Sequence, residues 1–151
     1  MLALWIILGV VIALALMIVL ISYLCFRMAF YATRKPDKED ISLPVGDIYE
    51  VYRDQMVAFI REARAMNWEP VEIRSFDGLR LTGKYYAYAP GAPIELMFHG
   101  YRGTSERDLC GGVQRCFALG HSALIVDQRG CGRSGGDTIT FGIREKRDCR
   151  A

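Results

Sequence analysis

The amino-acid sequence predicts an α/β domain that is preceded by one transmembrane helix. Three observations support this prediction. Residues 1–26 contain no charged side chain, residues 71–88 alternate apolar and polar residues around a turn signal, and short apolar runs then alternate with helical segments up to residue 151. Alternation of strands and helices is typical of an α/β domain with a largely parallel sheet.

Residues 1–26 are predicted to be a retained membrane anchor. At 1.5 Å per residue, a helix of this length spans roughly 39 Å, which exceeds a hydrocarbon core of about 30 Å. A cleaved signal peptide would have a basic start, a shorter apolar core and a small-residue cleavage site. None of these is present, and the bulky Tyr23 and Leu24 before Cys25 disfavour a lipoprotein cleavage site.

The charged residues predict how this anchor is oriented. All 19 basic and 17 acidic side chains lie at or beyond Arg27, and the first charges after the helix are Arg27, Arg34, Lys35 and Lys38. The positive-inside rule then places the following domain in the cytoplasm, so a single-pass protein of the cell membrane is expected, with the lipid bilayer as its partner. The net charge of +2 gives no reason to expect a nucleic-acid partner.

Residues 27–46 are predicted to be a juxtamembrane linker, because they include a charged stretch with two prolines. An amphipathic helix is expected over residues 47–68, with Asp47 as its N-cap and Glu50 closing a capping box. Seven apolar residues recur there at helical spacing: Ile48, Val51, Tyr52, Met56, Phe59, Ala63 and Met66. We expect this face to pack on the following domain; a membrane-lying or partner-binding surface is the alternative.

Residues 69–151 are predicted to form the α/β domain. Two alternating strands, 71–76 and 79–88, are separated by Asp77-Gly78, a strong hairpin signal. A short apolar strand at 94–98 follows, then a helix from about Ser105 to Leu119 that Gly120 ends, and a second buried strand at 122–127. A last helix should begin near Phe141 and continue to Ala151. Two buried strands and an interrupted helix cannot cover both faces of a sheet, so the domain is expected to be incomplete.

The five cysteines do not predict a stabilising framework. Their number is odd, they form no C-x-x-C pair, and Cys25 lies in the predicted membrane span. The sequence therefore predicts neither a set of disulfides nor a zinc site, and the cysteines fit a reducing compartment.

The stretch "DQRGCGRSGGD" at 127–137 fits two catalytic patterns by its letters alone. Gly130-x-Gly132-x-x-Gly135 matches the dinucleotide-binding fingerprint, but polar residues separate the preceding strand from the glycines, and a helix would begin too late. Gly132-x-Ser134-x-Gly136 matches the nucleophile elbow of serine hydrolases, but the residues before Gly132 cannot form a buried strand. We therefore do not expect Ser134 to be a nucleophile.

A third pattern, Asp127-x-Arg129-Gly130-x-Gly132-x-Ser134, agrees with its surroundings. "IELMFHGYRG" and "ALIVDQRGCGRSGG" together resemble the α/β-hydrolase superfamily. The closest likeness is to bacterial membrane-anchored members related to the serine aminopeptidase and lysophospholipase-like group. The resemblance covers about residues 47–151 and implies the N-terminal half of an α/β-hydrolase sheet, built as a hairpin followed by β-α-β-α.

The resemblance also implies roles for individual residues. His99 and Gly100 would form the oxyanion turn, and Tyr101 would supply a backbone N–H to the oxyanion hole. A wall of the site would be shaped by a loop in which Asp and Arg side chains bond backbone groups; its residues are Asp127, Arg129, Gly130, Gly132 and Ser134.

The function implied by the resemblance is that of a membrane-anchored serine hydrolase. It would cleave an ester, thioester or amide of a small acyl substrate through an acyl-serine, with no cofactor and no metal. The catalytic triad of such enzymes runs Ser…Asp/Glu…His, and its serine would lie some tens of residues beyond Ala151. We therefore expect this chain to be truncated before the nucleophile and inactive. A non-catalytic, membrane-tethered interaction module is the alternative.

Overall fold

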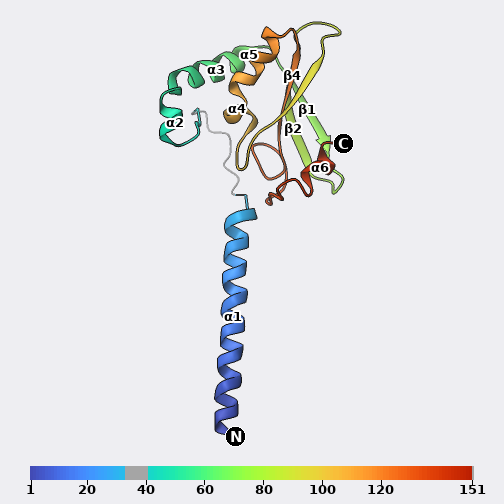
Figure 1. Cartoon of the computed structure of the whole chain (residues 1–151). Coiled ribbons are helices and arrows are strands. Elements are labelled where there is room, and N and C mark those ends of the chain that lie inside the picture. Colours follow the sequence, from blue (N-terminus) through green and yellow to red (C-terminus); the bar gives the residue numbers. More distant parts are fainter. Residues whose placement is uncertain (33–40, 151) are drawn as a thin grey trace. The chain divides into compact units, whose positions relative to one another are not determined.

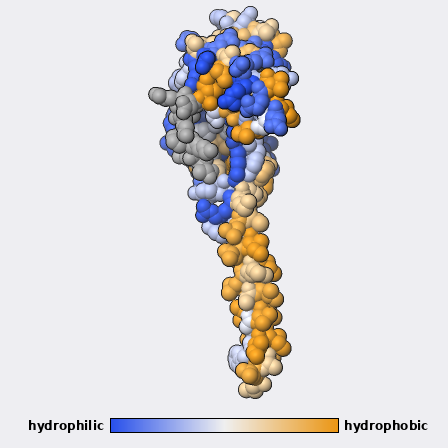
Figure 2. Space-filling view, turned by 90° about the vertical axis from the view of Figure 1, so that its left-hand side faces the viewer, coloured by the Kyte–Doolittle hydropathy of each residue, from blue (hydrophilic) through white to orange (hydrophobic). Residues whose placement is uncertain are grey.

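The structure is a computed structural model that describes residues 1–32 and 41–150 (Figure 1). The chain divides into two compact units, Met1–Tyr31 and Ala32–Ala151. The first unit is the helix α1 (Leu2–Phe30), whose most apolar window has a mean hydropathy of 3.2. This helix is long and apolar enough to cross a membrane, and Figure 2 shows hydrophobic residues along its length.

Helix α1 continues four residues past the expected boundary at 26, so Arg27 lies in its last turn. The predicted linker over 27–46 therefore begins as helix. Arg34, Lys35 and Lys38, on which the predicted orientation rests together with Arg27, lie outside the described residues.

The second unit begins its regular structure with two short helices in place of the single one predicted over 47–68. Helix α2 spans Asp47–Glu50, and α3 spans Arg53–Ala65. The predicted capping box is wrong. Gly46 occupies the N-cap position with φ 143°, so Asp47 is already helical and makes no side-chain capping bond. A capping side chain must stand on the non-helical residue before the first turn.

The predicted apolar face is correct only in its second half. Ala63 is buried and Met56, Phe59 and Met66 are half-buried, whereas Ile48, Val51 and Tyr52 are exposed. The break between α2 and α3 explains the difference, because residues on either side of it no longer share one helical face.

The sheet has four strands in the order β1-β2-β4-β3. Strands β1 (Glu69–Arg74) and β2 (Arg80–Tyr86) form the predicted antiparallel hairpin, with Gly78 at φ 84° in the turn. Strand β4 (Ser122–Asp127) pairs antiparallel with β2 and parallel with β3 (Ile94–Phe98). A largely parallel sheet was the wrong expectation for the described strands, because β4 pairs antiparallel with β2 of the hairpin and only β3 and β4 are parallel.

The helical segment between β3 and β4 ends where the sequence predicts. It consists of α4 (Ser105–Asp108) and α5 (Cys110–Ala118), separated at Leu109. Gly120 follows with φ 75°, and the next N–H, that of His121, returns to the carbonyl of Cys116. This geometry is typical of a glycine that terminates a helix.

The last predicted helix is shorter than expected. Residues 141–144 form turns, and α6 covers only Glu145–Asp148. The start is delayed because Phe141 and Gly142 have φ of 49° and 92°, which a right-handed helix does not allow.

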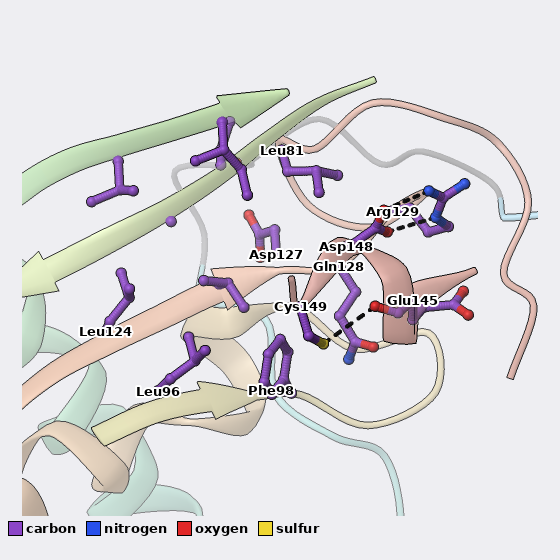
Figure 3. Close-up of a pocket in the computed structure, with 15 residues that line it drawn as sticks. Leu81, Leu96, Phe98, Leu124, Asp127, Gln128, Arg129, Glu145, Asp148 and Cys149 are labelled. Atoms are coloured by element: carbon purple, nitrogen blue, oxygen red, sulfur yellow. Dashed lines mark hydrogen bonds and ion pairs between the residues drawn. The ribbon is translucent and has the colours of Figure 1, made fainter. Parts of the chain in front are cut away.

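Helices α3 and α5 lie on one side of the sheet (Figure 1). The core on this side contains Tyr86, Val113, Cys116, Ala123 and Ile125. Residues that alternate with these along the strands face the other side, where they line a cavity of about 240 Å³ beside α6 (Figure 3). Its apolar lining consists of Val71, Ile73, Leu81, Leu96, Phe98, Leu124 and Val126.

Candidate active site

His99 connects the ends of the parallel strands β3 and β4. Its buried ring accepts the backbone N–H of Gln128 at Nε2, 3.0 Å away, and Nδ1 lies 2.8 Å from the carbonyl oxygen of Gly100. The side-chain amide of Gln128 donates in return to the carbonyl of His99. Both ring nitrogens are therefore engaged, with Nδ1 carrying the proton of a neutral imidazole.

The turn after His99 is braced by Asp108 of α4. Its carboxylate accepts the Gly100 N–H at 3.2 Å, and the Gly103 N–H donates to the Gly100 carbonyl at 3.1 Å. A Cβ on Gly103 would overlap the carboxyl group of Asp108, so the close approach requires glycine. Between these glycines, Arg102 has φ 54°, a strained value for a residue with a side chain.

Tyr101 lies at the apex of this turn. Its ring stacks on Phe141 with 4.9 Å between ring centroids, and the Arg102 guanidinium lies 5.1 Å from the centroid of Tyr101. A cavity of about 190 Å³ opens here. Its lining includes the three predicted oxyanion residues, His99, Gly100 and Tyr101, and the loop residue Arg129.

Asp127 holds the loop after β4 against helix α4. One carboxylate oxygen accepts the Ser105 N–H at 2.8 Å, and the other accepts the Arg133 N–H at 3.0 Å. Gly132, at φ 48°, passes directly beside this carboxylate, and a Cβ there would overlap it. Asp127 thus bonds backbone groups, as the resemblance implies.

Ser134 is completely buried. Its hydroxyl oxygen accepts the Thr82 N–H at 2.9 Å and donates to the carbonyl of Asp127. No helix follows it directly, because α6 begins only at Glu145. This geometry is unlike the exposed serine of a nucleophile elbow.

The glycines of the same stretch serve its internal turns. Gly130 has φ 72°, and its N–H donates to the Gly135 carbonyl at 2.8 Å. The Gly135 N–H donates to the Arg80 carbonyl of β2 at 2.6 Å. A dinucleotide fingerprint would instead direct such N–H groups at a pyrophosphate.

Arg129 departs from the expectation that it bonds backbone groups. It is 2% exposed and forms bidentate contacts with two carboxylates, Asp148 of α6 at 2.6 and 2.7 Å and Asp77 of the hairpin turn at 3.0 and 3.2 Å. The planar guanidinium presents donors that suit two carboxylates at once. Hydrogen bonds from Arg129, and then from Ser75, hold the pKa of Asp77 well below its ordinary value.

Known structures share this arrangement of strands and helices. The Pyrococcus furiosus esterase Pf2001 matches with a TM-score of 0.55 and 19% identity, over 80% of this chain and 40% of the esterase. DcsB, solved with a substrate analogue, matches with a TM-score of 0.51 and 23% identity, over 56% of this chain and 29% of DcsB. The chain has the α/β-hydrolase fold.

An α/β-hydrolase from Vibrio vulnificus gives a TM-score of 0.48 at 21% identity, over 81% of this chain and 46% of that protein. This chain covers less than half the length of both Pf2001 and DcsB. Neither the models of protein families nor the sequences of curated proteins give a match.

Within this hydrolase fold, sequence reasoning missed three carboxylates, Asp77, Asp148 and Glu145. The buried Glu145 accepts hydrogen bonds from the N–H and hydroxyl of Thr140, at 2.8 and 2.6 Å, and from the Gly142 N–H at 2.9 Å. Burial raises its pKa, but these bonds outweigh burial, and the pKa lies below its ordinary value. No local sequence pattern marks these residues. The partner of Asp77 and Asp148 is distant in the sequence, and the partners of Glu145 lie in a turn, which the periodicity of strands and helices does not describe.

The site therefore combines a hydrogen-bonded turn after β3 with a charged, hydrogen-bonded wall. Within residues 1–32 and 41–150, no three His, Cys, Asp or Glu side chains form a group that could hold a metal ion.

Proposed function

We propose that this chain is the N-terminal part of a membrane-anchored serine hydrolase. Helix α1 is its single transmembrane anchor, and the α/β-hydrolase domain faces the cytoplasm. The enzyme cleaves an ester, thioester or amide of a small acyl substrate. A serine oxygen bonds to the carbonyl carbon while a histidine takes the serine proton and passes it to the leaving group; water then releases the acid from the acyl-serine.

The observation that carries the proposal is the braced turn at His99–Gly100–Tyr101. His99 is fixed from two sides, and Asp108 holds Gly100. The Tyr101 backbone N–H is then the donor to the developing oxyanion. A preorganised donor of this kind contributes roughly 2.7–4 kcal/mol to lowering the barrier.

The triad in this proposal lies outside residues 1–151. Two observations favour this placement. The buried hydroxyl of Ser134 and both ring nitrogens of His99 are already bonded within the fold. The sheet face opposite α3 and α5 also leaves Leu96 and Phe98 more than 40% exposed. The 151-residue chain by itself is then inactive.

A fluorophosphonate probe tests the inactivity of this chain. Such probes bond covalently to activated serines, and we expect no labelling of the 151-residue chain in membranes or detergent. Labelling that disappears in Ser134→Ala would show that Ser134 is a nucleophile and would overturn the proposal.

The coding DNA tests the hydrolase assignment itself. Beyond codon 151 we expect a G-x-S-x-G sequence, followed by an Asp or Glu and a His. A gene without them in any frame would contradict a serine hydrolase.

A further inference from the structure

The segment that leads into α3 exposes a group of apolar side chains. The 45–52 patch consists of Val45, Ile48, Tyr49, Val51 and Tyr52, all of which are exposed. Val45, Val51 and Ile48 are 98%, 81% and 78% exposed. Figure 2 shows the side of the domain to which α2 and α3 belong, and orange groups lie there among hydrophilic ones.

Two backbone hydrogen bonds form helical turns within this segment. The Tyr49 N–H donates to the Gly46 carbonyl at 2.9 Å, and the Tyr52 N–H donates to the Tyr49 carbonyl at 3.1 Å. Residues three and four apart are neighbours in such helical turns. Exposed apolar residues that gather into a patch often mark a site of protein or membrane interaction.

The position of the patch in the chain indicates what binds it. Helix α1, long and apolar enough to cross a membrane, ends at Phe30, and the patch begins at Val45. At no more than 3.6 Å per residue, residues 31–44 reach at most about 50 Å. Under the proposed anchoring, this length of chain lets the patch reach the bilayer that α1 enters.

The residue types of the patch fit the boundary between lipid and water. Tyrosine is enriched there, because its ring is apolar and its hydroxyl is polar. The charges within the patch are mixed, with Asp47 and Glu50 acidic and Arg53 within 3.3 Å of Glu50. Such a surface has no electrostatic preference for anionic lipids, so its binding depends on apolar contact.

We propose that the 45–52 patch inserts into the interfacial layer of a zwitterionic bilayer and forms a second membrane attachment. This inference rests on the proposed membrane anchoring. The patch fixes the start of α3 at the membrane surface, and α3 packs on α5 in the hydrolase domain.

Quenching of tryptophan fluorescence by brominated lipids tests the insertion. The full chain is placed in phosphatidylcholine vesicles whose acyl chains carry bromine near the headgroup, with unbrominated vesicles as reference. Trp5→Phe removes the tryptophan of α1, which leaves Trp68 as the baseline, and Val51→Trp then adds a reporter in the patch. Tyr88→Trp is the matched control, because Tyr88 is a half-exposed residue outside the patch.

We expect the brominated lipids to remove most of the emission added by Val51→Trp and to leave that added by Tyr88→Trp. The loss should persist at high salt and disappear when Ile48→Asp is added. Equal emission from both reporters would overturn the inference. If the emission added by Val51→Trp shifts with protein concentration and does not respond to bromine, the patch binds a second copy of the chain, which would also overturn the inference.

Native Trp5 separates this inference from the proposal on which it rests. If bromine near the lipid headgroups quenches Trp5, which lies in the first turn of α1, while the reporter of the Val51→Trp variant stays bright, α1 is in the membrane and only the patch proposal fails. If Trp5 also stays bright, the membrane anchor itself is refuted. Circular dichroism of each variant checks that the domain is folded.

Discussion

The hydroxyl of Ser134 joins strands β2 and β4 near the end of their ladder. Thr82 and Asp127 are the last residues paired between these strands, and the Thr82 N–H and the Asp127 carbonyl both bond to Ser134. The Ser134 hydroxyl thus bonds one backbone group of β2 and one of β4 at this end of their ladder. This explains a buried hydroxyl in a loop without any catalytic role for it.

Ser134→Ala should lower the free energy of unfolding by about 1–3 kcal/mol, because it leaves buried backbone groups without this partner. Urea unfolding in detergent micelles, followed by the fluorescence of Trp68, measures the change. Ser42→Ala, at an exposed serine, should stay within about 0.5 kcal/mol of the native chain. Equal effects of the two substitutions would contradict a bonding role for Ser134.

Gly132→Ala should also destabilise the domain, by roughly 1–3 kcal/mol. The new Cβ would overlap the Asp127 carboxyl group, and φ 48° is unfavourable for alanine. Gly91→Ala is the matched control, since Gly91 has φ 78° but no atom within 4 Å of the added Cβ. The same urea experiment separates steric overlap from the strain of a positive φ, because only Gly132 has both. A smaller loss of unfolding free energy for Gly132→Ala than for Gly91→Ala would refute the overlap.

At the scale of elements, Arg129 joins three segments that are distant in the sequence. Its guanidinium bonds Asp77 in the β1–β2 turn and Asp148 in α6, and it lies 5.2 Å from the ring centroid of Phe76. These ion pairs hold the short α6 beside the hairpin turn. A buried arginine with two carboxylate partners is costly to leave incompletely paired.

Asp77→Asn should therefore weaken the domain at pH 7, and the difference should depend on pH. The folded-state pKa of Asp77 is depressed by its bonds to Arg129 and Ser75, so its contribution is complete above the unfolded pKa of about 3.9. It is lost as the pH falls from there through the folded value. The gap between the urea midpoints of the two chains should stay constant from pH 7 to about pH 4 and narrow as the pH falls further to 3. A constant gap down to pH 3 would contradict this linkage.

The strands could be predicted because their signals are local. Period-two alternation on both sides of Asp77-Gly78 defines the hairpin, and short apolar runs define β3 and β4. The direction of β2 relative to β4 is not encoded in either strand, since it depends on the position that β4 takes in the sheet. The break between α2 and α3 likewise has no clear local signal, because residues 47–66 contain no proline or glycine.

The residues of the site were predicted from the family resemblance. His99, Gly100 and Tyr101 follow β3, and Asp127 ends β4, so the parallel pairing of these strands places them at one edge of the sheet. The partners of Arg129 lie 52 and 19 residues away in the chain. No periodicity connects such positions, and only the folded chain identifies the pair.

At the scale of the whole molecule, the proposed cytoplasmic orientation can be tested through Cys149. This thiol is exposed, whereas Cys110, Cys116 and Cys131 are buried. Burial, with a smaller effect of Asp127, raises the pKa of Cys131 to about 11, which further suppresses its reactive thiolate.

A membrane-impermeant maleimide should label the chain in bacterial spheroplasts only after permeabilisation, with Cys149 as the labelled residue. Cys149→Ser is the control and should remove most of the signal. Labelling of intact spheroplasts at Cys149 would place the domain on the outer side of the membrane.

The strand order β1-β2-β4-β3 also determines when the sheet can form during synthesis. The hairpin leaves the ribosome first, with the inner edge of β2 unpaired until Ser122–Asp127 has been made and can enter between β2 and β3. An unpaired strand edge of this kind can associate with other chains. A nascent chain that stops before Ser122 thus carries a hairpin in which one edge of β2 is unpaired. A chain that has passed Asp127 but not Asp148 has its sheet but lacks one carboxylate of Arg129.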